Sequence, residues 1–310
     1  MPEIVRIDAL LPQEMAKRAE EVGARKCRLP FWPLFTLAIL AGAFIALGAI
    51  FSTTVSAGTA GVLPFGAARL LSGLVFCLGL VLVVVGGAEL FTGNALISMA
   101  WASGTVSTLQ VLRNWSIVYT GNFIGAVATA VFLYLARQYT FGAGAVGLAA
   151  LEIARVKTTL GFVQAVMLGI LCNALVCLAV WLCLGARSTT DKILAIVFPI
   201  SAFVAAGFEH SVANMYFIPF GLFIKTDSAF LAIIGKSAAD YASLTWTNFI
   251  LVNLLPVTLG NVIGGVALVG LTYWFIYLQP ESALVPASTQ TTLAQHSPLP
   301  AEAEADGQQV

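Results

Sequence analysis

Long apolar runs are the feature that most restricts how this chain can fold. Two of them, 70–101 and 193–224, are long enough to cross a bilayer but are interrupted near their middles by polar, glycine-bearing segments. Four uninterrupted runs reach the roughly 20 residues that a helix needs to span the hydrocarbon core; they are 34–55, 111–136, 160–184 and 247–278. With 59% hydrophobic and 10% charged residues and a mean hydropathy of +0.92, the composition excludes a water-soluble protein. We predict an all-α polytopic membrane protein with six transmembrane helices, two of them broken.

The two ends of the chain indicate its orientation. Residues 1–29 hold six of the 15 Lys and Arg residues, which by the positive-inside rule places this end in the cytoplasm, and an even number of spans returns the C-terminus to the same side. Residues 30–278 are the predicted six-span domain, and the Ser, Thr, Gln, Pro and Ala-rich residues 279–310 are predicted to be disordered. Within 1–29 we expect an amphipathic helix at the cytoplasmic membrane face, acting either as an anchor or as a gating element. Its apolar positions are Leu11, Met15, Ala19 and Val22.

The two interruptions match each other. One reads GAELFTGN at 87–94 and the other reads GFEHSVAN at 207–214, so each has a glycine two positions before a glutamate and an asparagine five positions after it. The next span of each half repeats a second motif, TGNFIG at 120–125 and LGNVIG at 259–264. Because three spans per half make the second unit enter the membrane from the opposite side, the sequence predicts a 3+3 inverted repeat.

Broken helices inside a membrane imply a pathway. Each interruption leaves backbone N–H and C=O groups that cost several kcal/mol unless protein or a water-filled cavity satisfies them. The half-helix after each break presents free N–H groups and a partial positive charge, which suits an anion. We therefore expect a route for a small negative solute where the two breaks meet.

Two glutamates lie deep within the interrupted spans and need partners there. Lys26 precedes the first span and Lys157 the fourth, at the same place in each half. We therefore predict two ion pairs, Lys26 with Glu89 and Lys157 with Glu209. A second interpretation, compatible with the first, is that each glutamate caps the N-terminus of a half-helix through backbone N–H groups. The charged and amide residues assigned to these structural groups are Glu89, Glu209, Lys26, Asn94 and Asn214.

One histidine lies within a span. His210 sits on the second interruption, and its counterpart in the first is Leu90, so the repeat itself does not require an imidazole there. A lone buried histidine is commonly a structural hydrogen-bonding residue. Beside a predicted path, an imidazole that titrates near neutral pH can instead stabilise or protonate a weak-acid anion, and we favour that interpretation.

Taken together, these segments and the six-span order resemble the formate/nitrite transporter family, bacterial formate channels in particular, over about residues 10–278. The resemblance implies an aquaporin-like fold that assembles as a homopentamer in a bacterial inner (plasma) membrane, with one pore per protomer. It also implies a central gate or proton relay at His210 and Thr92. The other positions that it assigns are a cytoplasmic constriction at Leu80 and Leu90, a periplasmic constriction at Phe76, Val176 and Phe203, and a polar approach at Asn173 and Lys157.

The predicted function is a channel for small monovalent anions, formate first. A bare anion loses many kcal/mol of hydration in an apolar slit, whereas proton transfer through His210 would let the neutral acid pass. Nitrite or hydrosulfide is the alternative substrate within the family. Outside it, an aquaporin-like neutral-solute pore would carry Asn-Pro-Ala at both breaks, and neither has that sequence.

Other classes of function fit less well. An enzyme would need a nucleophile with a base, or clustered metal ligands, and a structural scaffold would leave the broken helices unexplained. The five cysteines contain no CxxC pair, so we expect neither a metal nor a cofactor. Equal numbers of basic and acidic residues, 15 and 15, give no basic excess for nucleic acid, so the expected partners are a small anion, membrane lipid and other copies of the chain.

Overall fold

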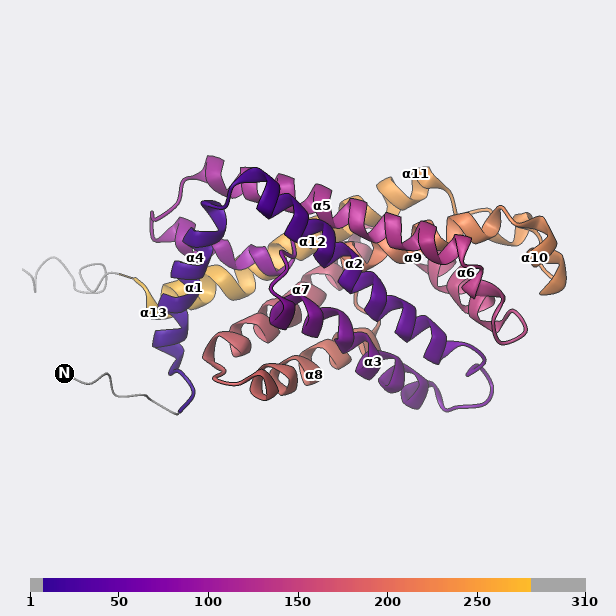
Figure 1. The fold of residues 1–310 in the computed structure, drawn as a ribbon, viewed down its shortest axis with the longest axis horizontal. Coiled ribbons are helices and arrows are strands. Elements are labelled where there is room, and N and C mark those ends of the chain that lie inside the picture. Colours follow the sequence, from indigo (N-terminus) through magenta and orange to yellow (C-terminus); the bar gives the residue numbers. More distant parts are fainter. Residues whose placement is uncertain (1–7, 280–310) are drawn as a thin grey trace, which may run out of the picture.

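The computed structural model describes residues 8–279 and is drawn in Figure 1. Within those residues the chain is helical throughout and has no strand, as predicted. Six regions are long and apolar enough to cross a membrane, which confirms the predicted number of spans. They are α2 (Phe31–Ser56), α3 (Phe65–Gly86), α5 (Thr108–Leu135), α7 (Phe162–Gly185), α8 (Thr189–Ala206) and the last region, Ala238–Tyr277. The tail that was predicted to be disordered lies outside the described residues from position 280 onward.

Helix α3 and helix α8 each end at a left-handed glycine. Gly87 has φ 82° and Gly207 has φ 78°, a conformation that glycine adopts without the steric cost of a Cβ atom. After Gly87 the chain forms a short 3-10 turn, η1 (Gly93–Leu96), and then α4 (Ile97–Ala102). After Gly207 it forms α9 (Ser211–Lys225). The helical conformation therefore stops at the two segments whose sequences match.

The last membrane-spanning region is not a uniform α-helix. The order along it is the 3-10 turn η3 (Ala238–Tyr241), α11 (Trp246–Asn248), the π-helix η4 (Phe249–Leu254), α12 (Leu255–Ile263), the π-helix η5 (Gly264–Leu271) and α13 (Thr272–Tyr277). Helix α5, which carries the matching motif of the first half, is a regular α-helix. These π segments were not predicted from the sequence.

Two glycine motifs allow the long helices to cross closely. A Cβ atom on Gly125 of α5 would lie 2.0 Å from the carbonyl oxygen of Ile39 in α2, so any larger residue would push these helices apart. A Cβ atom on Gly264 would lie 2.1 Å from the carbonyl oxygen of Ile170 in α7. Small residues at such contacts let backbones pack in van der Waals contact within a membrane. The repeated GN-x-x-G motif therefore fixes where α2 meets α5 and where α7 meets the last span.

Short helices cover the two ends of the bundle (Figure 1). At the left of the view, α1 (Pro12–Cys27) lies with α4 and α13, and its Met15 and Ala19 pack against Met99 and Trp181. The apolar face of α1 therefore covers the protein itself, whereas the sequence suggested a helix lying on the membrane face. Leu11, expected on that face, is 65% exposed. At the right end lie α6 (Ala145–Lys157) and α10 (Ser228–Ile233), which were not predicted from the sequence.

Candidate functional site

The segments that follow α3 and α8 meet in the interior of the bundle. Thr92 and His210 lie there, 118 positions apart in the sequence, with Thr92 Oγ1 2.9 Å from His210 Nε2. Thr92 is 0% and His210 3% exposed, so the contact is sealed from the surface of the chain. The structure thus brings the two residues of the predicted central gate into direct hydrogen-bonding contact.

The hydrogen bonds around His210 determine which tautomer its neutral imidazole adopts. His210 is the N-cap residue of α9, and its Nδ1 accepts a hydrogen bond from the backbone N–H of Ala213 at 3.1 Å. In a neutral imidazole the other nitrogen then carries the hydrogen, so Nε2 donates to Thr92 Oγ1. The Thr92 hydroxyl accepts that bond and keeps its own hydrogen free to donate. The pair therefore offers one O–H donor to a solute at the centre of the bundle.

Apolar side chains border the Thr92–His210 pair. The Phe203 ring lies 6.0 Å from the imidazole, and Phe76 contacts Phe203 edge to face at a centroid distance of 5.6 Å. Val176 is 1% exposed. All residues of the two predicted constrictions belong to one buried cluster; they are Phe76, Val176, Phe203, Leu80 and Leu90.

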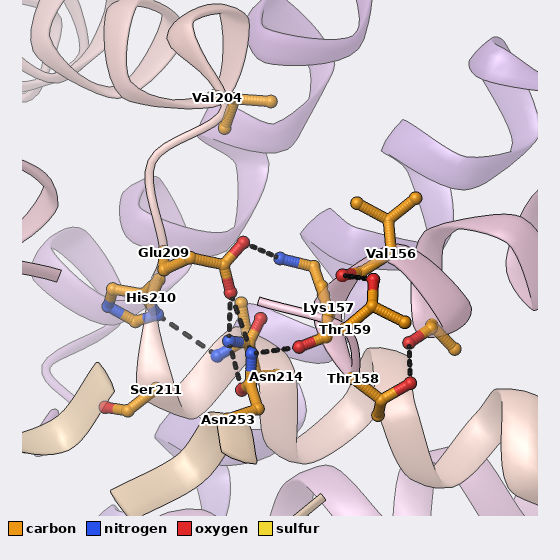
Figure 2. A network of polar contacts seen from close by, with 12 residues as sticks. Val156, Lys157, Thr158, Thr159, Val204, Glu209, His210, Ser211, Asn214 and Asn253 are labelled. Atoms are coloured by element: carbon orange, nitrogen blue, oxygen red, sulfur yellow. Dashed lines mark hydrogen bonds and ion pairs between the residues drawn. The ribbon is translucent and has the colours of Figure 1, made fainter. Parts of the chain in front are cut away.

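One polar group surrounds Glu209 (Figure 2). Lys157 Nζ donates to Glu209 Oε1 at 2.7 Å, so the predicted ion pair is present. The amides of Asn214 and Asn253 donate to Oε2 at 2.7 and 3.1 Å, and Asn253 also donates to the backbone oxygen of Lys157 at 3.0 Å. Glu209 is 5% exposed, and its carboxylate accepts hydrogen bonds from three donors. These donors replace the water that the buried charge has lost.

A second polar group of the same composition surrounds Glu89. Lys26 Nζ donates to Glu89 Oε2 at 3.1 Å and to Asn94 Oδ1 at 2.7 Å, which confirms the other predicted ion pair. Asn94 donates to Glu89 Oε2 at 2.8 Å and to Asn114 Oδ1 at 3.0 Å. Asn114 donates to the backbone oxygen of Lys26 at 3.2 Å. Each group therefore links a helix end, an interruption and a long helix.

The alternative role for the glutamates, as helix N-caps, is not what the structure has. Among the hydrogen bonds of residues 8–279, the carboxylates of Glu89 and Glu209 accept only from side chains. His210 caps α9 instead. The glutamates hold lysine and asparagine side chains in place and leave the start of α9 to the imidazole.

The asparagines of the repeated GN-x-x-G motif satisfy the backbone of the interruptions. Asn122 accepts from the N–H of Phe91 at 2.9 Å and donates to the carbonyl oxygens of Glu89 and Ala38 at 2.9 and 2.7 Å. Asn261 makes the same three bonds in the other half, to Ser211, Glu209 and Gly169, at 2.9, 2.9 and 2.8 Å. Each amide thus supplies partners that a continuous helix would have supplied from its own backbone.

The GN motifs were visible in the sequence, but their asparagines were not assigned to the site, and Asn114 and Asn253 were missed altogether. A signal for both was available. Asn114 precedes Asn122 by eight positions, and Asn253 precedes Asn261 by the same number, so the two amides of each helix lie on nearby faces about two turns apart.

Asn173, predicted on a polar approach together with Lys157, contacts the central residues. Its amide nitrogen donates to the carbonyl oxygens of Asn261 and Thr92 at 2.6 and 3.2 Å. Its Oδ1 is buried and has no partner among the described residues, which is also true of Asn214 Oδ1. The structure therefore places Asn173 beside Thr92, with a free acceptor.

Metal binding has no geometric basis in the part of the chain that the structure describes. Among residues 8–279, no group of three or more His, Cys, Asp or Glu side chains is arranged to hold an ion. The five cysteines are all buried and unpaired.

Comparison with known proteins identifies the class of site. The model of the family "Formate/nitrite transporter" matches residues 13–275. The chain belongs to the formate/nitrite transporter family. Formate channel FocA of Escherichia coli K12 is 47% identical over 274 residues, which are 88% of this chain and 96% of that protein. The family and this relative are channels or transporters, not enzymes.

Two solved structures of the family share the fold. One, a pentameric formate channel with formate bound, is 45% identical, with a TM-score of 0.76 over 80% of this chain and 98% of that one. The other, an FNT family ion channel, is 30% identical, with a TM-score of 0.73 over 86% of this chain and 99% of that one. Family membership and six candidate spans make this chain a multi-pass membrane transport protein.

Proposed function

We propose that the chain is a transmembrane channel for small monovalent anions and that its substrate is formate. The observation that carries the proposal is the buried Thr92–His210 hydrogen bond, formed where the segments after α3 and α8 meet inside six candidate spans. The 47% identical relative is named a formate channel, and the 45% identical structure holds formate. Nitrite and hydrosulfide are small anions that can also accept a proton, and they are the alternative substrates.

The proposed architecture is a 3+3 inverted repeat of the aquaporin type, in which α3 with α4, and α8 with α9, are the two broken helices. The matching bonds support it. In each half a lysine binds a glutamate, and the asparagine five positions after that glutamate binds the same carboxylate. In each half the asparagine of the GN-x-x-G motif also donates to the backbone oxygen of that glutamate. The protomer is proposed to work as a homopentamer surrounded by lipid, because the 45% identical formate channel is pentameric.

The proposed path runs along the bundle between its two covered ends. From the α6 end, an anion passes the constriction of Phe76, Val176 and Phe203, reaches the centre, and leaves past Leu80 and Leu90 toward the α1 end. An anion that enters the apolar stretch loses hydration, and that loss is offset only where donors replace water. At the centre the Thr92 hydroxyl is such a donor, because His210 Nε2 occupies its acceptor side.

Proton coupling through His210 has a structural requirement. A second proton on the ring must bind Nδ1, which accepts the Ala213 N–H. Protonation therefore requires that the first turn of α9 loses its cap. The imidazolium can then pass its Nε2 proton to Thr92 while the hydroxyl passes its own proton to formate, which leaves a neutral ring protonated at Nδ1. Proton transfer and loosening of the α9 start are thus proposed to occur together.

The orientation of the channel follows from its basic N-terminal segment. We assign the α1 end to the cytoplasm and the α6 end to the periplasm of a bacterial inner membrane, with both termini cytoplasmic. Residues 8–29 contribute Lys17, Arg18, Arg25, Lys26 and Arg28 to that end.

Flux measurements in proteoliposomes test the substrate and the role of the histidine. Wild type is compared for formate, nitrite and hydrosulfide under the same gradient, and formate is expected to move fastest. His210→Ala should lower formate flux on the order of a hundredfold, the lower end of the usual effect of a positioned acid–base group. His296→Ala, the other histidine of the chain, is the control and should leave flux unchanged. Absence of formate flux through wild type would remove the channel proposal, and faster nitrite flux would replace formate as substrate.

A further inference from the structure

Arg69 lies on the inward-facing side of α3. The outward side of this helix is lined with exposed leucines, which are Leu70 at 50%, Leu71 at 43%, Leu74 at 42% and Leu78 at 38%. The opposite side is buried and contains Phe76 and Leu80 at 3% and 2% exposure. Arg69 is half-buried and precedes Phe76 by seven positions, two helical turns, so it continues the inward row that carries both constriction residues.

The guanidinium of Arg69 reaches the end of α8. Its Nη2 donates to the carbonyl oxygen of Val204, and its Nε donates to that of Ala205 at 3.3 Å. Val204 follows Phe203 directly and stands above Glu209 in Figure 2. A guanidinium has five N–H donors, and these two bonds are its hydrogen bonds to the described residues. The positive charge thus lies next to the Phe76–Phe203 pair with donors to spare.

Arg69 has no carboxylate partner among residues 8–279, which distinguishes it from Lys157. Lys157 Nζ lies 2.7 Å from Glu209 and 5.5 Å from the ring of Phe217, which stacks 6.5 Å from Phe76. The Lys157–Glu209 pair carries no net charge, so it provides little long-range attraction for an anion. Glu209 also acts electrostatically on Arg69. Because Lys157 pairs with Glu209, the three groups together keep one net positive charge beside this constriction.

The fold does not need a cation at the end of the interrupted helix. At the corresponding end of α3, the N–H groups of Gly87 and Ala88 bond to the Val83 oxygen at 3.0 and 2.9 Å. No side-chain donor to the last carbonyls of α3 is found among the hydrogen bonds of the described residues. By the proposed repeat, in which Glu89 corresponds to Glu209, the counterpart of Arg69 is Thr189. The arginine is thus a feature of one half only and has no charged counterpart in the other half.

We propose that Arg69 is the anion-collecting residue of the α6 end: its charge raises the concentration of formate-sized anions at the Phe76–Phe203 constriction and so sets the rate of entry at low substrate. This inference rests on the proposed channel function. Binding to the α8 carbonyls positions the guanidinium, and its remaining N–H groups face an arriving carboxylate in the planar geometry that suits one. Lys157 then serves to neutralise Glu209.

Initial formate uptake into proteoliposomes, measured against formate concentration at low and high ionic strength, tests the proposal. Arg69→Gln keeps a hydrogen-bond donor for the α8 carbonyls and removes the charge. A unit charge at about 10 Å and an effective dielectric constant of about 50 changes the local anion concentration about threefold, so the half-saturating formate concentration should rise about threefold. The maximal rate should change little, and the dependence of uptake on salt should weaken. Arg69→Lys should retain the wild-type values.

Chemical restoration of charge tests the same point on protein that has already folded. Arg69→Cys is treated with a cationic aminoethyl or an anionic sulfonatoethyl methanethiosulfonate, and the wild type, whose five cysteines are buried, is the control. The cationic reagent should increase uptake and the anionic reagent should decrease it. Equal effects of both reagents, or wild-type half-saturation and salt dependence in Arg69→Gln, would overturn the assignment of Arg69. Lack of flux in wild type would instead overturn the channel function.

Discussion

The Lys157–Glu209 pair gives the sharpest test of how the interior is held together. Lys157→Met keeps an unbranched side chain of similar length but leaves the Glu209 carboxylate, 5% exposed, without its cation. Breaking one side of a buried ion pair costs about 3–5 kcal/mol, because the remaining charge cannot return to water. At about 2–4 °C per kcal/mol for a chain of this size, the melting temperature should fall on the order of 10 °C.

The assay is thermal unfolding of purified protein in detergent, followed by tryptophan fluorescence. Lys236→Met, at an exposed lysine, is the matched control and should change the melting temperature little. The double variant Lys157→Met with Glu209→Gln removes both charges, so it should recover a large part of the loss, as expected for coupled residues. The reasoning is refuted if Lys157→Met melts like the control. It is also refuted if the fall in melting temperature of the double variant equals the sum of the falls measured for Lys157→Met and for Glu209→Gln alone.

Three further predictions follow from individual contacts. Gly260→Ala should prevent stable folding, because its Cβ would lie 2.2 Å from a backbone oxygen of α7, whereas Gly66→Ala, with nothing within 4 Å, should fold normally; the measured quantity is the yield of monodisperse protein. Thr92→Val should reduce formate flux at least about tenfold through loss of the central O–H donor, whereas Thr92→Ser should retain most of it; equal flux in both would contradict the donor role. The hydrogen bond from the Tyr139 hydroxyl, at 2.6 Å, is the main cause that holds the pKa of Asp227 below its usual value. A lowered carboxyl pKa stabilises the fold at pH values above the unfolded-state pKa of about 4, and this stabilisation is lost as pH falls through the folded-state pKa. Melting temperature should therefore fall on acidification below about pH 4, and fall less in Tyr139→Phe.

The spans and the ion pairs could be predicted from the sequence because each depends on a local or a counting argument. Apolar length alone identifies a span. Glu89 and Glu209 are the acidic residues deep within the spans, and a lysine stands at the same place before each half, so the pairing was the simplest way to neutralise them. The contact of Thr92 with His210 was different, since it came only from resemblance to the family.

Other features depend on packing that a single sequence does not encode in a readable pattern. Helix α6 is 13 residues long and lies between spans, where no long apolar run marks it. The apolar stripe of α1 was visible, but whether it covers lipid or protein depended on the position of α4. The inward direction of Arg69 required knowledge of which side of α3 faces α8. The cap provided by His210 required the geometry of the turn before α9.

The motif asparagines have a consequence for hydration. Asn122 and Asn261 bind the exposed N–H and C=O groups of the interruptions directly, so these groups do not rely on water for partners. The centre of the proposed path can therefore empty of water between passages without loss of backbone hydrogen bonds. Wetting and drying of the path are thus separated from the stability of the fold, and a dry interval that blocks free ions leaves the protein scaffold unchanged.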